Sequence, residues 1–210
     1  DAISFTTQKA AVEGGYGAYT NATYLVIVDE NHPNYRKLMR AADAGIDAPE
    51  EKDKDGKAVE QYVVIDAATG QPALHSACSK GTLEYEGEVN GVKVRTGFSL
   101  LTETVNEYTM DEYAEITGVS VEDLERIAKE YTSHGTRVGI CHKGGSAASV
   151  NGIDTVMGAA VLHAIVGANQ MIGGNAPNSP APTTAGNGAR YKLGAIEGKP
   201  DVSTKNACYI

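Results

Sequence analysis

The side chains best suited to bind a ligand lie between residues 142 and 152. Glycines there let backbone N–H groups approach a ligand, while the Lys, His, Ser and Asn side chains can bind phosphate or other polar groups. A helix predicted to follow would add the positive end of its dipole. The pattern predicts an anion-binding loop. An interpretation in which the glycines only make a turn stays open. The candidate ligand-binding residues are His142, Lys143, Gly144, Gly145, Ser146, Asn151 and Gly152.

The elements on either side of this loop must position it. Arg137–Cys141 is an apolar stretch that predicts a short buried strand, with Cys141 as a buried thiol. Residues 153–166 are apolar nearly all the way round a helix, which predicts that the helix is buried and that His163 is a hydrogen-bonded core histidine. Strand, glycine-rich loop and helix in succession are typical of α/β proteins.

The rest of the chain supplies further predicted elements. A β-branched run predicts a strand over residues 23–28, a short helix is expected over 34–42, and 45–60 reads as a solvated, charged loop. Strands over 61–66 and 83–95 follow, the latter folded at Asn90-Gly91, which strongly predicts a hairpin. We expect α/β class, with strand-loop-helix units of a Rossmann-like domain and a small antiparallel β arm.

This pattern divides the chain into four segments. They are an N-terminal strand, short helix and charged loop (1–59), the β arm (60–95), an α/β cofactor-facing segment (96–174) and an extended tail (175–210). Within 96–174, Thr109-Met-Asp-Glu112 forms a capping box for one helix, and Ser120 begins an amphipathic helix that ends at His134.

Charge and cysteine content exclude several functions. The net charge is −9, and the 18 Lys and Arg residues are scattered rather than clustered, which argues against a nucleic-acid partner. Cys78, Cys141 and Cys208 are far apart and form no CxxC motif, so we expect no metal site or iron–sulfur cluster built from this chain alone. No apolar run is as long as a membrane span.

Several motifs occur in a characteristic order: Glu115-Ile-Thr-Gly-Val-Ser-Val-Glu-Asp-Leu124, Gly144-Gly145, Asn151-Gly152, Ile165-Val-Gly-Ala-Asn169 and Gly173-Gly174. Together they resemble the central part of the catalytic subunits of the molybdopterin (dimethyl sulfoxide reductase-type) oxidoreductases. The V-K-V-x-T-x-F-x-L-L pattern of residues Val92–Leu101 and the His142-Lys-Gly-Gly145 run are most similar to the tetrathionate, thiosulfate, polysulfide and arsenate reductase branch.

The resemblance implies an internal segment of a much larger subunit that reduces a sulfur- or arsenic-oxyanion substrate. It implies a molybdenum bis(molybdopterin guanine dinucleotide) cofactor in the full-length subunit, an iron–sulfur cluster only outside this segment, and a metal ligand also outside it. The implied partners are the remainder of the same subunit, an iron–sulfur electron-transfer subunit and a membrane anchor subunit. The implied location is the extracytoplasmic or periplasmic side of a bacterial or archaeal membrane.

Two other functions stay open from the residues alone. The chain could be a complete small α/β module that binds an anion or nucleotide without catalysis, or a structural interaction domain that docks through the β arm and the 45–60 loop. As an isolated segment of a larger subunit, the chain should leave apolar surface uncovered on the 153–166 helix, whereas a complete module should have a closed core.

Overall fold

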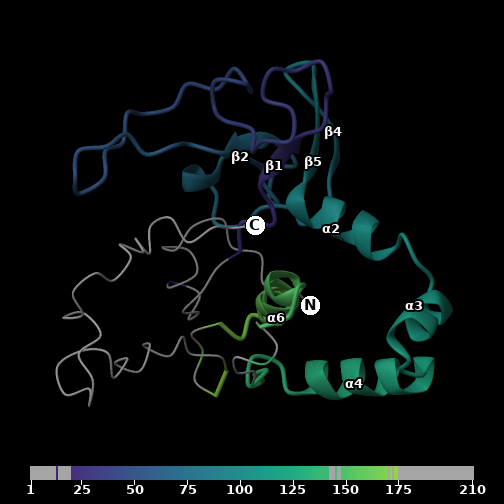
Figure 1. The fold of residues 1–210 in the computed structure, drawn as a ribbon. Coiled ribbons are helices and arrows are strands. Elements are labelled where there is room, and N and C mark those ends of the chain that lie inside the picture. Colours follow the sequence, from purple (N-terminus) through teal and green to yellow (C-terminus); the bar gives the residue numbers. More distant parts are fainter. Residues whose placement is uncertain are drawn as a thin grey trace, which may run out of the picture. The chain divides into compact units, whose positions relative to one another are not determined.

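The computed structural model describes residues 13, 20–141, 145, 148–169, 171 and 173–174. Its strands are β1 (Leu25–Ile27), β2 (Val63–Ile65), β3 (Pro72–Leu74), β4 (Glu86–Val89) and β5 (Val92–Thr96). Its α-helices are α2 (Gly97–Val105), α3 (Met110–Thr117), α4 (Val121–Ser133) and α6 (Gly152–Ile165), and a 3-10 helix, η1, spans His75–Ala77 (Figure 1). This mixture of helices and small sheets confirms the predicted α/β class.

The larger sheet has three antiparallel strands in the order β1-β5-β4. The predicted hairpin is confirmed: β4 and β5 pair so that Val89 lies opposite Val92, and the two residues between them have positive φ, 52° at Asn90 and 74° at Gly91. Positive φ at both turn residues matches the twist of the flanking strands. On its other edge β5 pairs with β1, with Leu25 opposite Thr96.

A second, two-stranded sheet of β2 and β3 joins the first through the core. Met39, Val63 and Ile65 lie in one cluster with residues of β1, β4 and β5, and Met39 and Val63 are fully buried. The β-rich part of the chain therefore has its own closed core. The cluster consists of Leu25, Ile27, Met39, Val63, Ile65, Val89 and Val94.

The short helix predicted over residues 34–42 is wrong. The segment instead forms turns and isolated bridges, with Leu38 opposite Val26 and Arg40 opposite Tyr62. Arg36 has a φ of 62°, a left-handed conformation that interrupts a right-handed helix. Beyond it, the Met39 N–H donates to the Leu25 carbonyl at 2.7 Å, so this segment acts as an extra edge of β1.

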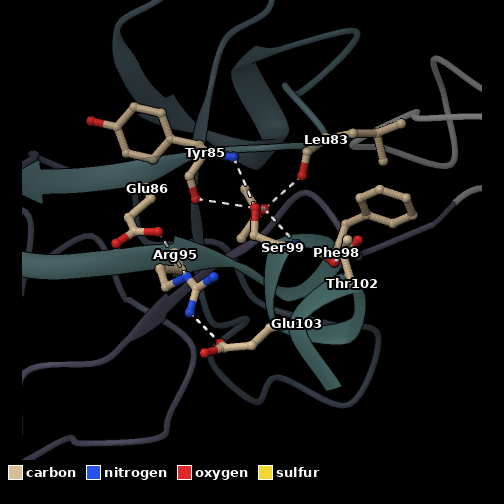
Figure 2. A network of polar contacts seen from close by, with 9 residues as sticks. Leu83, Tyr85, Glu86, Arg95, Phe98, Ser99, Thr102 and Glu103 are labelled. Carbon is tan, nitrogen blue, oxygen red and sulfur yellow. Dashed lines mark hydrogen bonds and ion pairs between the residues drawn. The ribbon is translucent and has the colours of Figure 1, made fainter. Parts of the chain in front are cut away.

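Strand β5 passes directly into α2 through a hydrogen-bonded junction. The buried Thr96 caps the helix by accepting from the Ser99 N–H at 3.2 Å, and its hydroxyl donates to the Leu83 carbonyl at 2.6 Å. Figure 2 shows Ser99 facing the backbone of Tyr85, whose N–H donates to the Ser99 hydroxyl at 3.1 Å. The Thr-x-x-Ser part of the Val92–Leu101 pattern thus fixes where the sheet ends and the helix begins.

The same junction carries an ion-pair network on its surface. Figure 2 shows Arg95 between two carboxylates, Glu86 of the neighbouring strand and Glu103 of α2. Its Nε lies 3.3 Å from the Glu86 carboxylate. Arg95 thereby links the β4–β5 hairpin to the helix that follows it.

Local capping signals begin the next two helices as predicted. Thr109 and Glu112 form the reciprocal capping box of α3, and Gly118 ends that helix with a φ of 69°. The Ser120 hydroxyl accepts from the Asp123 N–H at 3.2 Å to begin α4, and His134 is the C-cap of that helix. None of the helices in the described ranges is long and apolar enough to cross a membrane.

The strand predicted at Arg137–Cys141 is wrong, because these five residues carry no strand. A strand needs a neighbouring strand to accept its N–H groups. Here the Ile140 N–H donates instead to the imidazole of His163, at 2.9 Å. Cys141 is exposed, so the prediction of a buried thiol is also wrong.

Candidate cofactor-facing site

The candidate site lies between residue 141 and the first turn of α6, and two contacts hold the flanking segments together. The first is the bond from the Ile140 N–H to Nε2 of His163. Since Nε2 is the acceptor, the ring hydrogen of the neutral histidine lies on Nδ1. His163 is only 2% exposed, which confirms the prediction of a hydrogen-bonded core histidine. The contact fixes the segment before the loop against the helix after it.

The second contact is a close backbone approach at Gly174. A Cβ there would lie 2.2 Å from the Ala168 carbonyl oxygen and 2.7 Å from that of Thr136, so only glycine fits. Ala168 is fully buried, and Gly167 has a φ of 68°, which ends the helical path after α6. The Ile165–Asn169 and Gly173-Gly174 motifs therefore pack the end of α6 against the backbone just after α4. Sequence reasoning missed Thr136, which carries no side-chain signal because its carbonyl makes the contact.

The N-terminus of α6 forms one side of the site. Asn151 is its N-cap, yet the Asn151 side chain makes no capping hydrogen bond, whereas α2, α3 and α4 each have a side-chain cap. Asn151 is exposed and Gly152 is buried. The amide of Asn151 is therefore not used within the helix and can face a ligand beside the positive end of the helix dipole.

Gly145 provides a second observation that is compatible with a ligand at this site. Its φ is not positive, and a Cβ built on it would meet no atom within 4 Å. Neither backbone conformation nor packing against the described residues requires glycine at this exposed position. Glycine also serves where a ligand approaches the backbone closely, and that need is compatible with the open space here.

The remaining predicted site residues, His142, Lys143, Gly144 and Ser146, lie outside the described residues. Of the predicted set, the structure describes Gly145, Asn151 and Gly152, and it places the last two together at the start of α6. Their assignment to a ligand stays a prediction.

The described residues give this site little electrostatic attraction for an anion. Asp154 lies exposed in the first turn of α6, where its carboxylate already complements the helix dipole and weakens the attraction of an anion. Among the described residues no group of His, Cys, Asp or Glu could hold a metal ion. A bound anion would therefore depend on backbone N–H groups and on the loop cations.

The helices around the site lack a core of their own. In α2, α3 and α4 no residue is buried, and in α6 only Gly152 and His163 are. On α6, Ile153 is 69% exposed and Met157 is 58% exposed. Among the described residues nothing covers this apolar surface, as expected for a segment of a larger protein.

Comparison with known proteins gives two relatives for nearly the whole chain. It is 29% identical over 199 residues to the A subunit of the selenate reductase of Mesobacillus selenatarsenatis, a match over 92% of this chain and 17% of that protein. It is 26% identical over 202 residues to the A subunit of the tetrathionate reductase of Salmonella typhimurium, covering 95% of this chain and 19% of that protein. No family model matches the chain, and no solved structure matches it.

These matches confirm the resemblance that the motifs predict. Over nearly its whole length the chain resembles catalytic subunits of the molybdopterin oxidoreductases. It is similar to the A subunits of a selenate reductase and a tetrathionate reductase, and it spans less than a fifth of the length of each.

Proposed function

We propose that this chain is a segment of the catalytic subunit of a molybdopterin oxidoreductase that reduces an oxyanion. The observation that carries the proposal is the match of 92% and 95% of the chain to the A subunits of a selenate reductase and a tetrathionate reductase. A sulfur- or arsenic-oxyanion substrate follows from the same similarity and from the Val92–Leu101 pattern.

In this proposal the residues of the glycine-rich loop and of the start of α6 bind the cofactor and do not react themselves. The proposed cofactor-binding residues are His142, Lys143, Gly144, Gly145, Ser146, Asn151 and Gly152. When bound, a molybdenum bis(molybdopterin guanine dinucleotide) supplies the oxygen-atom and electron-pair chemistry. The open space at Gly145 and the uncapped Asn151 fit the close approach of such a phosphate-bearing group. Lys143 would neutralise part of its charge.

The proposed partners extend beyond the chain. The two relatives are named as A subunits, which supports an assembly with other subunits. By family resemblance we propose an iron–sulfur electron-transfer subunit and a membrane anchor subunit, and a position on the extracytoplasmic side of the membrane.

A simple anion-binding module is the weaker account, because its core should be closed. The uncovered α6 surface, with Ile153 69% exposed, favours the larger subunit.

The test is a Gly145→Val substitution in the native polypeptide that contains this sequence. We expect its molybdenum content to fall about tenfold, since a hydrogen bond to a charged group is worth about 1.5–3 kcal/mol. Reduction of tetrathionate or selenate by a reduced viologen dye should fall in parallel. In the 210-residue chain alone the same substitution should leave the melting temperature nearly unchanged, because a Cβ at this position meets no atom within 4 Å. Full molybdenum content in the variant would contradict the role of this loop.

A further inference from the structure

Helix α6 carries a stripe of apolar and small side chains that is exposed except at its last member, Ala164, which is half-buried. Ile153, Met157, Ala160 and Ala164 follow one another at spacings of four, three and four residues, which places them on one face of the helix. Ile153 is 69% exposed and Met157 is 58% exposed. No charged residue interrupts the stripe. A face of this kind has the composition of a helix-packing surface, yet nothing in the described part of the chain covers it.

A different face of the same helix already packs within the chain. Gly152, Val156, Ala159 and His163 share that face at the same spacing, and Gly152 and His163 are buried. At about 100° of rotation per residue, the two faces are about a quarter turn apart. The exposed stripe is therefore a second, separate packing face. It is distinct from the face through which His163 contacts the segment before the loop.

We propose that the exposed stripe docks an apolar face of another segment of the same catalytic subunit. The inference rests on the proposed function, since the relatives extend over more than five times the matched length. Ala160 and Ala164 are small enough to let the backbone of a partner helix approach, and Ile153 and Met157 supply the side chains that enter its grooves. The stripe thus fixes α6, and with it the uncapped N-terminus at Asn151, relative to the rest of the enzyme.

The test is the reactivity of a cysteine placed on the stripe, Met157→Cys, toward a bulky maleimide. The labelling rate is read at each site by peptide mass spectrometry in two contexts: the native full-length polypeptide and the 210-residue chain alone. We expect the rate to be at least tenfold lower in the full-length polypeptide. Lys129→Cys is the matched control, since the Lys129 side chain on the charged face of α4 is 77% exposed. It should label at similar rates in both contexts.

Three results would overturn the proposal. The first is equal labelling of Met157→Cys in both contexts. The second is protection in the isolated chain that disappears on dilution, because a second copy would then be the occupant. The third is protection in the isolated chain that disappears when residues 175–210 are removed, because the tail would then cover the stripe. Molybdenum is measured on the same full-length sample. Metal with fast labelling contradicts only the docking surface, whereas absence of metal contradicts the proposed function itself.

Discussion

Substitution of Gly174 by alanine tests whether the glycine motif after α6 acts through packing. The new Cβ would lie 2.2 Å from the Ala168 carbonyl oxygen and 2.7 Å from the Thr136 carbonyl oxygen. Side-chain Cβ atoms essentially never come closer than 3.0 Å to such neighbours, so the backbone has to shift by roughly 0.8 Å. Both obstacles are main-chain atoms, so no rotation of a side chain can relieve the clash.

The expected cost follows from this geometry. Overpacking of a well-packed site costs about 1–3 kcal/mol. For a chain of this length each kcal/mol shifts the melting temperature by about 2–4 °C, so Gly174→Ala should lower it by roughly 2–12 °C. Gly158→Ala is the matched control. Its Cβ meets nothing within 4 Å. Because alanine is favoured over glycine inside a helix by about 0.5–1 kcal/mol, this variant should melt about 1–4 °C higher.

The assay is thermal unfolding of the 210-residue chain followed by far-ultraviolet circular dichroism at 222 nm, the helix signal. The same substitution at two positions in one region should therefore change stability in opposite directions. If Gly174→Ala melts at the temperature of the unsubstituted chain, or if both variants shift in the same direction, the close-approach argument is refuted.

Three other outcomes are expected. His163→Phe should lower the free energy of unfolding by about 1–3 kcal/mol in urea titrations, because the half-buried Ile140 N–H loses its acceptor. In alkylation followed by peptide mass spectrometry, the exposed Cys141 should react much faster at neutral pH than Cys78, whose pKa is raised by burial and by a nearby carboxylate. Hydrogen bonds from Thr109 lower the pKa of Glu112. The stabilisation they give is present above the ordinary carboxylate pKa and is lost as the pH falls through the lowered value. Helix content should therefore fall on acidification below about pH 4, and less so in Glu112→Gln.

Signals that act within a few residues could be predicted from the sequence. Asn90-Gly91 forms the hairpin turn because few other residue pairs accept positive φ at both positions. The Thr109 capping box and the Ser120 cap begin α3 and α4 because each hydroxyl accepts from the N–H group three residues ahead. Such interactions depend little on the rest of the fold.

Features that depend on distant parts of the chain could not be predicted. Residues 34–42 have helical composition, but Met39 is needed in the core beside β1, and Arg36 takes a left-handed conformation to bring it there. Apolar residues before Cys141 suggested a strand, yet no strand of the described residues pairs with them and the Ile140 N–H donates to His163. In both segments a tertiary contact overrides the local preference.

The candidate site was predicted only in outline. The sequence indicated a glycine-rich loop before an apolar helix, and the structure confirms α6 and shows that the Asn151 side chain does not cap it. The sequence could not indicate that Gly174 contacts the Thr136 carbonyl, because a contact with a backbone carbonyl does not depend on the type of that residue. It also could not distinguish a glycine that makes a turn from one that faces a ligand. The open space found at Gly145 is compatible with a ligand there, and the assignment stays a prediction.

The measurement that tests the central claim most directly is made on the native polypeptide that contains this sequence. Its intact mass and its molybdenum and tungsten content are determined together, by mass spectrometry and elemental analysis of the purified protein. We predict a chain several times longer than 210 residues that carries about one molybdenum or tungsten atom. A native chain of only this length, purified without either metal, would contradict the account.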